Sequence, residues 1–213
     1  MRPVLTSSST MRVTVERGSL VSESRRYERG DYERGLAEAD AVVESDYVTQ
    51  TLNHNSMETH QAVCEWEGGD RLTVYISTQA IWDVRQNVAE HYGQPPDHVR
   101  VVCRFMGGGF GSKNGPGDYT YIAADLARET GRPVKCALTR SEENLDAGNR
   151  NATIQRLRAG ARADGTLTAL EGEFVNASGW DGWLTSTGGP MEMLYGCENV
   201  KIAEYGAKLN SGP

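Results

Sequence analysis

The chain has 213 residues, of which 38% are hydrophobic and 24% are charged, and its formal net charge is −7. This length and composition are ordinary for one sizeable globular domain or for two small lobes that share a core. No run of Lys or Arg exceeds two residues. The sequence therefore argues against a nucleic-acid or anionic-membrane partner, because both need a concentrated basic face.

Targeting and cysteine signals are few. No apolar stretch approaches the roughly 20 residues that span a bilayer, and the serine-rich start of the chain lacks the apolar segment of a secretory signal. We therefore expect a cytoplasmic protein. The cysteines form no C-x-x-C pair, so we expect reduced thiols, with any iron–sulfur cluster on another polypeptide. They are Cys64, Cys103, Cys136 and Cys197.

The hydrophobic pattern predicts an α+β fold with mixed sheets and packed helices. Residues 1–29 are polar and weakly patterned, so we expect them to form a linker. We expect one domain over residues 30–213, either as a single body or as two lobes. In chain order the expected elements are a short helix at 31–38, strands at 41–52, 61–66 and 71–77, a helix from Ile81 to Gly93, a strand at 99–105, a helix at 118–130, a strand at 134–138, a short helix after Thr139, strands at 153–163 and 166–175, another short helix, and a strand at 200–209.

Local signals support these boundaries. Gly68-Gly69-Asp70 and Asp164-Gly165 are typical of hairpin turns, and Gly93 and Gly131 are typical of helix ends. Thr139-Arg140-Ser141-Glu142 has the spacing of a capping box, which predicts the start of a helix.

The sharpest chemical feature is the segment from Arg104 to Lys113, with glycines at 107, 108, 109 and 111. Glycines after a strand let the backbone turn sharply and approach a ligand, and free N–H groups in such a turn can bind phosphate or oxo groups. The alternative is a tight strand-to-loop connection. The spacing fits neither the Walker A motif nor G-x-G-x-x-G.

A second feature is Gln79, which lies where a strand gives way to the Ile81 helix. Its amide could donate a hydrogen bond to a group bound above the strand end. By itself, however, Gln79 is better interpreted as a capping or turn residue.

Together these segments resemble the molybdopterin-binding domain of xanthine dehydrogenase, aldehyde oxidase and their bacterial relatives. The resemblance covers roughly Gly30 to Asn210. It is carried by Gly30-Asp31, Ala37 to Asp40, Asn55 to His60, Glu65-Trp66, Thr78-Gln79, Pro96 and Gly107 to Lys113.

The resemblance implies roles for several residues. Gln79 would hydrogen-bond an oxygen ligand of molybdenum. The backbone of Gly108, Gly109, Phe110 and Gly111 would approach the metal's oxo group and the pterin, and the Phe110 ring would wall off the substrate cavity. The cofactor would be molybdopterin, in its cytosine dinucleotide form. The enzyme would hydroxylate a carbon centre with water and pass electrons to iron–sulfur and flavin partners.

Two expected substrate-binding positions differ from the purine-hydroxylating members of the family. Those enzymes carry Glu where this chain has Asn114, and an Arg that aligns with Lys201. Loss of a carboxylate and a fork-shaped guanidinium removes the pair that would grip a purine. We therefore expect an aldehyde or an N-heterocycle as the small-molecule substrate.

The family's second cofactor-contacting loop and its general-base Glu would lie beyond Pro213. We therefore expect this chain to be a truncated first half of the domain that has no catalytic residue of its own. We expect it to be inactive and free of cofactor until it is joined by the remainder of the molybdopterin-binding subunit. Two alternatives stay open: a non-catalytic scaffold of the same fold, and a generic nucleotide-binding domain.

Other conspicuous residues have plainer interpretations. His54 and His60 are expected to be structural or surface residues rather than metal ligands. For Glu58 we expect a buried hydrogen-bonding role, and for Lys113 either a local salt bridge or a contact with a cofactor phosphate. The tryptophans are expected to anchor the core or the contact between lobes; they are Trp66, Trp82, Trp180 and Trp183.

Overall fold

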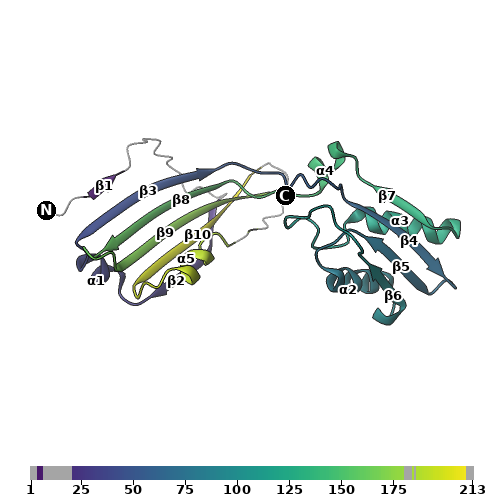
Figure 1. Ribbon diagram of the computed structural model, residues 1–213, viewed down its shortest axis with the longest axis horizontal. Helices are drawn as coiled ribbons and strands as arrows, with labels where there is room; N and C mark the ends of the chain where they lie inside the picture. Colours follow the sequence, from purple (N-terminus) through teal and green to yellow (C-terminus); the bar gives the residue numbers. More distant parts are fainter. Residues whose placement is uncertain (1–3, 7–20, 180–183, 185, 210–213) are drawn as a thin grey trace. The chain divides into compact units, whose positions relative to one another are not determined.

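The computed structural model describes residues 4–6, 21–179, 184 and 186–209. The chain divides into two compact units (Figure 1): unit 1 comprises Met1–Leu52 and Asn151–Pro213, and unit 2 comprises Asn53–Arg150. In the described ranges, no helix combines the length and apolar character that crossing a membrane would require.

Unit 1 is built on a six-stranded sheet with the strand order β1-β3-β8-β9-β10-β2. β8 and β9 form an antiparallel hairpin, whereas β10 runs parallel to β9. Gly165 has a φ of 89° in the turn of that hairpin, which confirms the predicted Asp164-Gly165 turn. The strands are β1 (Val4–Thr6), β2 (Val21–Arg29), β3 (Ala41–Thr49), β8 (Thr153–Ala161), β9 (Leu167–Ser178) and β10 (Val200–Lys208).

Two short helices pack on this sheet, α1 (Tyr32–Ala37) and α5 (Gly189–Leu194). The start of α1 is held by Asn199, whose Oδ1 accepts a hydrogen bond from Asp31 N at 2.8 Å and whose Nδ2 donates to Thr168 O at 2.9 Å. Met191 of α5 packs against a buried cluster formed by Leu170, Phe174, Cys197, Val200 and Ile202.

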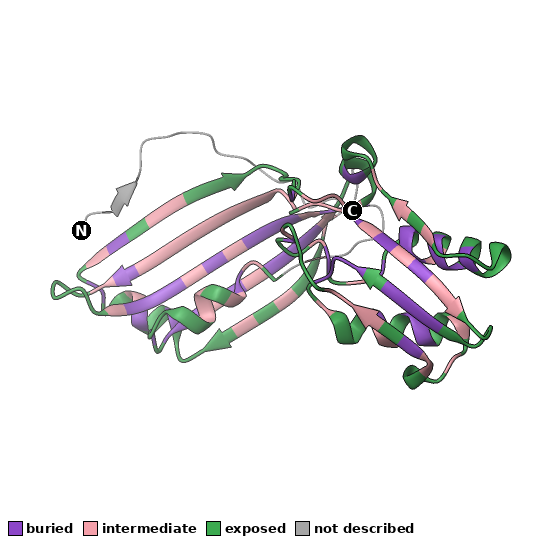
Figure 2. Cartoon of the chain, turned by 45° about the vertical axis from the view of Figure 1, so that its right-hand side comes forward, coloured by how far each residue is buried: buried purple, intermediate pink, exposed green. Residues whose placement is uncertain are grey.

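Unit 2 is built on a four-stranded sheet with the order β6-β5-β4-β7. Its strands are β4 (Gln61–Glu67), β5 (Arg71–Ile76), β6 (Val99–Val102) and β7 (Val134–Ala137), and its helices are α2 (Ile81–Tyr92), α3 (Asp118–Thr130), α4 (Arg140–Asp146) and the 3-10 turn η1 (Pro96–His98). Alternate residues of β5, Leu72, Val74 and Ile76, are buried in one core with the inner faces of α2 and α3. Figure 2 shows buried residues along the central strands of each sheet.

The helix ends follow the predicted local chemistry. α2 and α3 end at Gly93 and Gly131, which adopt the left-handed conformation with φ of 62° and 63°. The capping box of α4 is confirmed, because Thr139 N donates to Glu142 Oε2 at 2.7 Å and Glu142 N donates to Thr139 Oγ1 at 3.3 Å.

Three predictions need correction. Residues 21–29, expected to belong to a polar lead-in, form the edge strand β2. The sequence does not predict this strand because it lacks the alternation of apolar and polar residues typical of strands. Charged contacts, such as that of Arg25 with the buried Glu204 at 3.0 Å, stabilise it instead. β6 ends at Val102 rather than at residue 105. Trp82 is 64% exposed and is no core anchor, while Trp180 and Trp183 lie outside the described residues.

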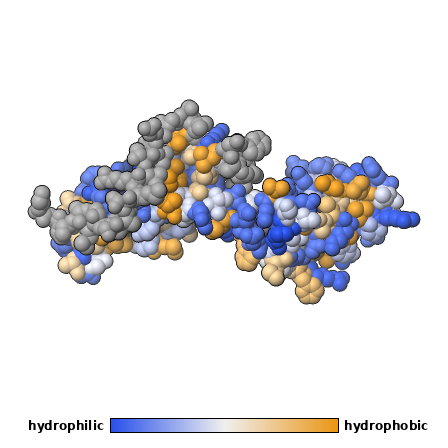
Figure 3. All heavy atoms as spheres, turned by 90° about the horizontal axis from the view of Figure 1, so that it is seen from above, coloured by the Kyte–Doolittle hydropathy of each residue, from blue (hydrophilic) through white to orange (hydrophobic). Residues whose placement is uncertain are grey.

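Both units also expose apolar side chains among hydrophilic ones, as the orange spheres in Figure 3 show. In unit 1 these include Val43, Tyr47 and Val48. In unit 2 they include Ile81 and Leu126 on the outer faces of α2 and α3.

Candidate functional site

The glycine loop between β6 and α3 has an unusual backbone. Gly108, Phe110 and Gly111 have positive φ values of 95°, 54° and 98°. A Cβ atom at Gly109 would lie 2.4 Å from Oε1 of Gln79, so the loop and this side chain are in closest contact there. Glycine is therefore favoured at 108 and 111 by conformation, and at 109 because a larger residue would displace the side chain of Gln79.

Gln79 lies between β5 and α2 and is hydrogen-bonded to the loop. Its Oε1 accepts from Gly111 N at 2.8 Å and from Lys113 N at 3.4 Å. Its own N donates to Lys113 O at 2.8 Å, and Thr78 Oγ1 donates to the same oxygen at 2.9 Å. The sequence prediction that Gln79 and the loop come together is confirmed.

This arrangement leaves hydrogen-bond donors without acceptors. Within the part of the chain that the structure describes, no acceptor is present for Nε2 of Gln79 or for the backbone N–H groups of Gly108, Gly109 and Phe110. Because Oε1 of Gln79 is already engaged, the amide presents its NH2 group as the available donor. An oxygen-rich or anionic group would match this donor set.

The end of the loop carries an ion pair between the buried Lys113 and the half-buried Glu58. The side chain of Lys113 is 0% exposed, and its Nζ donates to Glu58 Oε2 at 3.2 Å, to Glu58 O at 2.9 Å and to Ser77 Oγ at 3.0 Å. Of the two roles predicted for Lys113, the structure shows the local salt bridge.

The carboxylate of Glu58 collects four donors. Its Oε2 accepts from Ser77 Oγ at 2.5 Å, from Gly107 N at 2.7 Å and from Lys113 Nζ, and its Oε1 accepts from Gln61 Nε2 at 2.9 Å. Burial raises the pKa of Glu58, but these hydrogen bonds outweigh it and lower the pKa to about 2. The predicted hydrogen-bonding role of Glu58 is confirmed, but the side chain is 26% exposed rather than buried.

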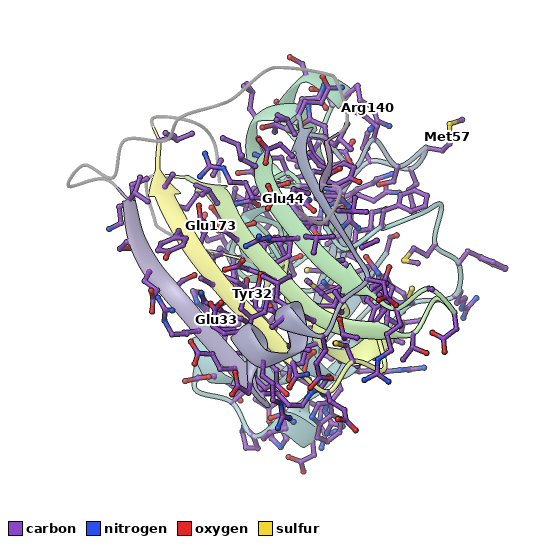
Figure 4. All side chains as sticks on the ribbon, turned by 90° about the vertical axis from the view of Figure 1, so that its left-hand side faces the viewer. Tyr32, Glu33, Glu44, Met57, Arg140 and Glu173 are labelled. Carbon is purple, nitrogen blue, oxygen red and sulfur yellow. The ribbon has the colours of Figure 1, made fainter. Side chains whose placement is uncertain are left out.

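A second buried pair supports the far end of the loop. His60 Nδ1 lies 2.8 Å from Glu143 Oε1, and His60 Nε2 lies 3.2 Å from Ser112 O. Arg140 donates both to Glu143 and to the carbonyl oxygen of Ser56. The neighbouring Met57 projects from its loop and is 92% exposed (Figure 4). Sequence reasoning missed this network, because its partners are 83 residues apart.

The exposed edge of the loop is held by polar side chains of the same unit. Arg150 donates to Phe110 O at 2.6 Å, and Asn114 Nδ2 donates to Gly111 O at 3.0 Å. The Phe110 ring covers Gly108, where a Cβ atom would meet the ring at 2.9 Å, and Phe110 is 61% exposed. Asn114 is thus brought together with Gln79 and the loop.

Lys201, the other expected substrate-binding residue, lies on β10 of unit 1. Its Nζ is 3.1 Å from Glu171 Oε1 and 5.4 Å from the centre of the Tyr32 ring. The hydroxyl of Tyr32 donates to the same carboxylate, through Oε2, at 2.8 Å. Lys201 therefore already has partners in unit 1, and its role toward a substrate stays a prediction.

Comparison with known proteins identifies the family of this chain. The model of the molybdopterin cofactor-binding domain family matches residues 15–213. The chain belongs to this family. The matched range includes β2.

Curated relatives include the xanthine dehydrogenase/oxidase of Gallus gallus, which is 29% identical over 208 residues, 94% of this chain and 15% of that protein. The aldehyde oxidoreductase molybdenum-binding subunit PaoC of Escherichia coli O157:H7 is 32% identical over 170 residues, 80% of this chain and 23% of that protein. Among solved structures, quinoline 2-oxidoreductase from Pseudomonas putida 86 matches with a TM-score of 0.74 and 24% identity, covering 90% of this chain and 26% of that one. This domain thus spans about a quarter or less of the length of these relatives.

The hydrogen-bond donors of the site fit the cofactor of the family. Molybdopterin carries oxygen- and nitrogen-rich groups that accept hydrogen bonds, and the loop presents N–H donors from Gly108 to Phe110 beside the amide of Gln79. A side chain at Gly109 would fill the space where the loop meets this amide.

Proposed function

We propose that the chain is the cofactor-binding portion of an oxidoreductase that uses water to hydroxylate an aldehyde or an N-heterocyclic carbon. The observation that carries this proposal is the hydrogen bond from Gly111 N to Gln79 Oε1 at 2.8 Å. This bond joins Gln79 to the glycine loop, so that the unpaired donors of both lie on one surface. The family relationship and the names of the relatives, among them an aldehyde oxidoreductase subunit, support the chemical class.

In this proposal Nε2 of Gln79 and the backbone N–H groups of Gly108, Gly109 and Phe110 would hold the cofactor by donating hydrogen bonds to its acceptor atoms. The cofactor is the cytosine dinucleotide form of molybdopterin. When bound, it supplies the redox-active metal that the oxidation of a carbon centre requires. The ring of Phe110, exposed at the loop, borders the substrate and excludes water from it.

The substrate assignment depends on Asn114 and Lys201. An amide at 114, held by Gly111 O at 3.0 Å, offers no charge to a purine, and Lys201 offers a point charge rather than a planar fork. These two residues favour an aldehyde or an N-heterocycle over xanthine, although the relatives include several xanthine dehydrogenases and a probable hypoxanthine oxidase.

The partners follow from the same assignment. The remainder of the molybdopterin-binding subunit would complete the pocket and supply the general base, and iron–sulfur and FAD subunits or domains would take up the electrons. We therefore expect the 213-residue chain by itself to be inactive. We also expect it to bind the cofactor so weakly that it purifies with much less than one molybdenum per chain, although an excess of cofactor in a titration still saturates it. Elemental analysis that finds about one metal per chain would contradict this expectation.

Two matched variants test the proposal. Gln79→Glu keeps an oxygen for Gly111 N and Lys113 N but replaces the NH2 donor with a carboxylate oxygen. Gln86→Glu makes the same change on α2, away from the loop. When the chain is titrated with purified molybdopterin, Gln79→Glu should weaken binding by about tenfold or more, the equivalent of one lost hydrogen bond of about 1.4 kcal/mol, while Gln86→Glu binds as the wild type. Equal affinities in all three proteins, or no saturable binding to the wild type, would refute the proposal.

A further inference from the structure

The loop that carries the donors is tied at both ends to a single side chain. We propose that Glu58 is a positioning residue, which holds the two ends of the glycine loop together and so sets the direction of the donors between them. This inference rests on the proposed function for the identity of the bound group. It concerns Glu58, which is not among the expected cofactor contacts.

The geometry assigns this role to one oxygen atom. Oε2 of Glu58 accepts from Gly107 N, at the start of the loop, at 2.7 Å and from Lys113 Nζ, at its end, at 3.2 Å. The backbone adds a third link, because Glu58 N donates to Gly107 O at 3.2 Å. A Cβ atom at Gly107 would lie 2.5 Å from Cβ of Glu58, so the two chains are packed without space between them.

The conformation of the loop explains why such a restraint is needed. Between Gly107 and Lys113, three residues have positive φ, and one of them is Phe110 with a φ of 54°. A residue with a side chain keeps such a conformation only where its surroundings hold it in place. Gln79 and Arg150 restrain the middle of the loop, and Glu58 restrains its ends.

The charge of the pair makes the restraint strong. Lys113 has no exposed side-chain surface, and among the described residues its ammonium donates to Glu58 and Ser77. Hydrogen bonds between ionised partners are shorter and stronger than neutral ones, and breaking a buried pair leaves an uncompensated charge. Because the ammonium of Lys113 is held in place, the end of the loop at Lys113 is held in place with it.

The other carboxylate oxygen provides a control. Oε1 of Glu58 accepts from Gln61 Nε2 at 2.9 Å and makes no contact with the loop among the described residues. Removing the Gln61 bond leaves both contacts between Glu58 and the loop in place. Removing the hydroxyl of Ser77 instead takes away a donor to Oε2 and an acceptor of Lys113.

The experiment measures amide hydrogen exchange and molybdopterin binding in the wild type, Glu58→Gln, Ser77→Ala and Gln61→Met. We expect exchange at the hydrogen-bonded amides of the loop, those of Gly107, Gly111, Ser112 and Lys113, to accelerate by about tenfold in Glu58→Gln and to a smaller extent in Ser77→Ala. Exchange in α3 should stay unchanged. Molybdopterin affinity should fall in the same order. Gln61→Met should match the wild type in both measurements.

The outcomes separate the two proposals. Loop exchange that is the same in Glu58→Gln as in the wild type would overturn the role of Glu58, whatever binds there. If Glu58→Gln does not fold, Ser77→Ala decides, and loop exchange equal to that of Gln61→Met would overturn it as well. If the loop exchanges faster in Glu58→Gln but the wild type binds no molybdopterin, the role of Glu58 in the loop is supported and the proposed function fails.

Discussion

Replacing Gly109 by Ala tests the contact between the loop and Gln79 directly. The added Cβ would lie 2.4, 2.7 and 2.9 Å from Oε1, Cδ and Cγ of Gln79. These atoms belong to a flexible side chain, so the side chain would move aside rather than the backbone. Gln79 would then lose its hydrogen bonds from Gly111 N at 2.8 Å and from Lys113 N at 3.4 Å. With about 0.5–1.5 kcal/mol for each bond, and less for the long one, we expect unit 2 to lose about 1–2 kcal/mol.

The assay is urea unfolding of the chain, followed by hydrogen exchange in peptides from unit 2. Gly115→Ala is the matched control, because a Cβ atom there has nothing within 4 Å, and it should change the stability by less than about 0.5 kcal/mol. In a Gln79→Ala background, Gly109→Ala should cause almost no further loss, because the clash is gone. An equal loss from Gly109→Ala with and without Gln79 would refute the reasoning.

Three further predictions concern other parts of the chain. Glu58 has a folded pKa of about 2 and an unfolded pKa of about 4.3, so its ionised form contributes at most about 3 kcal/mol to the free energy of unfolding. This contribution is complete above about pH 4.5 and is lost as the pH falls toward 2. A stability difference between the wild type and Glu58→Gln that does not change over this pH range would contradict the prediction. Thr139→Ala should lower stability by about 1 kcal/mol and speed exchange at the start of α4, and unaltered exchange there would count against the capping box. Asn199→Ala leaves the N–H of Asp31 and the carbonyl of Thr168 unpaired, so unit 1 should lose about 1–3 kcal/mol in urea unfolding. A loss confined to unit 2 would disprove that assignment.

Much of the secondary structure could be predicted because its signals are local. Gly93 and Gly131 end their helices since only glycine adopts the left-handed conformation without strain. Thr139 and Glu142 satisfy each other's backbone within one turn. The edge strand β2 could not be found this way, because Arg25 depends on Glu204, a partner 179 residues along the chain.

The site could be predicted in part for the same reason. The resemblance pointed to Gln79 and to residues 108–111, and the structure brings these elements together through one amide oxygen. The supporting pairs could not be found, because Glu58 and Lys113 are 55 residues apart and His60 and Glu143 are 83 apart. No periodicity links such residues, since their contact arises only when four strands and their connections have folded.

The path of the chain through unit 1 has a practical consequence. β3 and β8 are antiparallel neighbours, and their last register pair joins Thr49 to Thr153, whose hydroxyl oxygens lie 2.8 Å apart. All of Asn53–Arg150 is therefore an insertion at the tip of what would otherwise be an ordinary hairpin. A short Asn-Gly turn in its place would close that hairpin and yield unit 1 as an independent protein, while Asn53–Arg150 could be expressed as a separate module of its own.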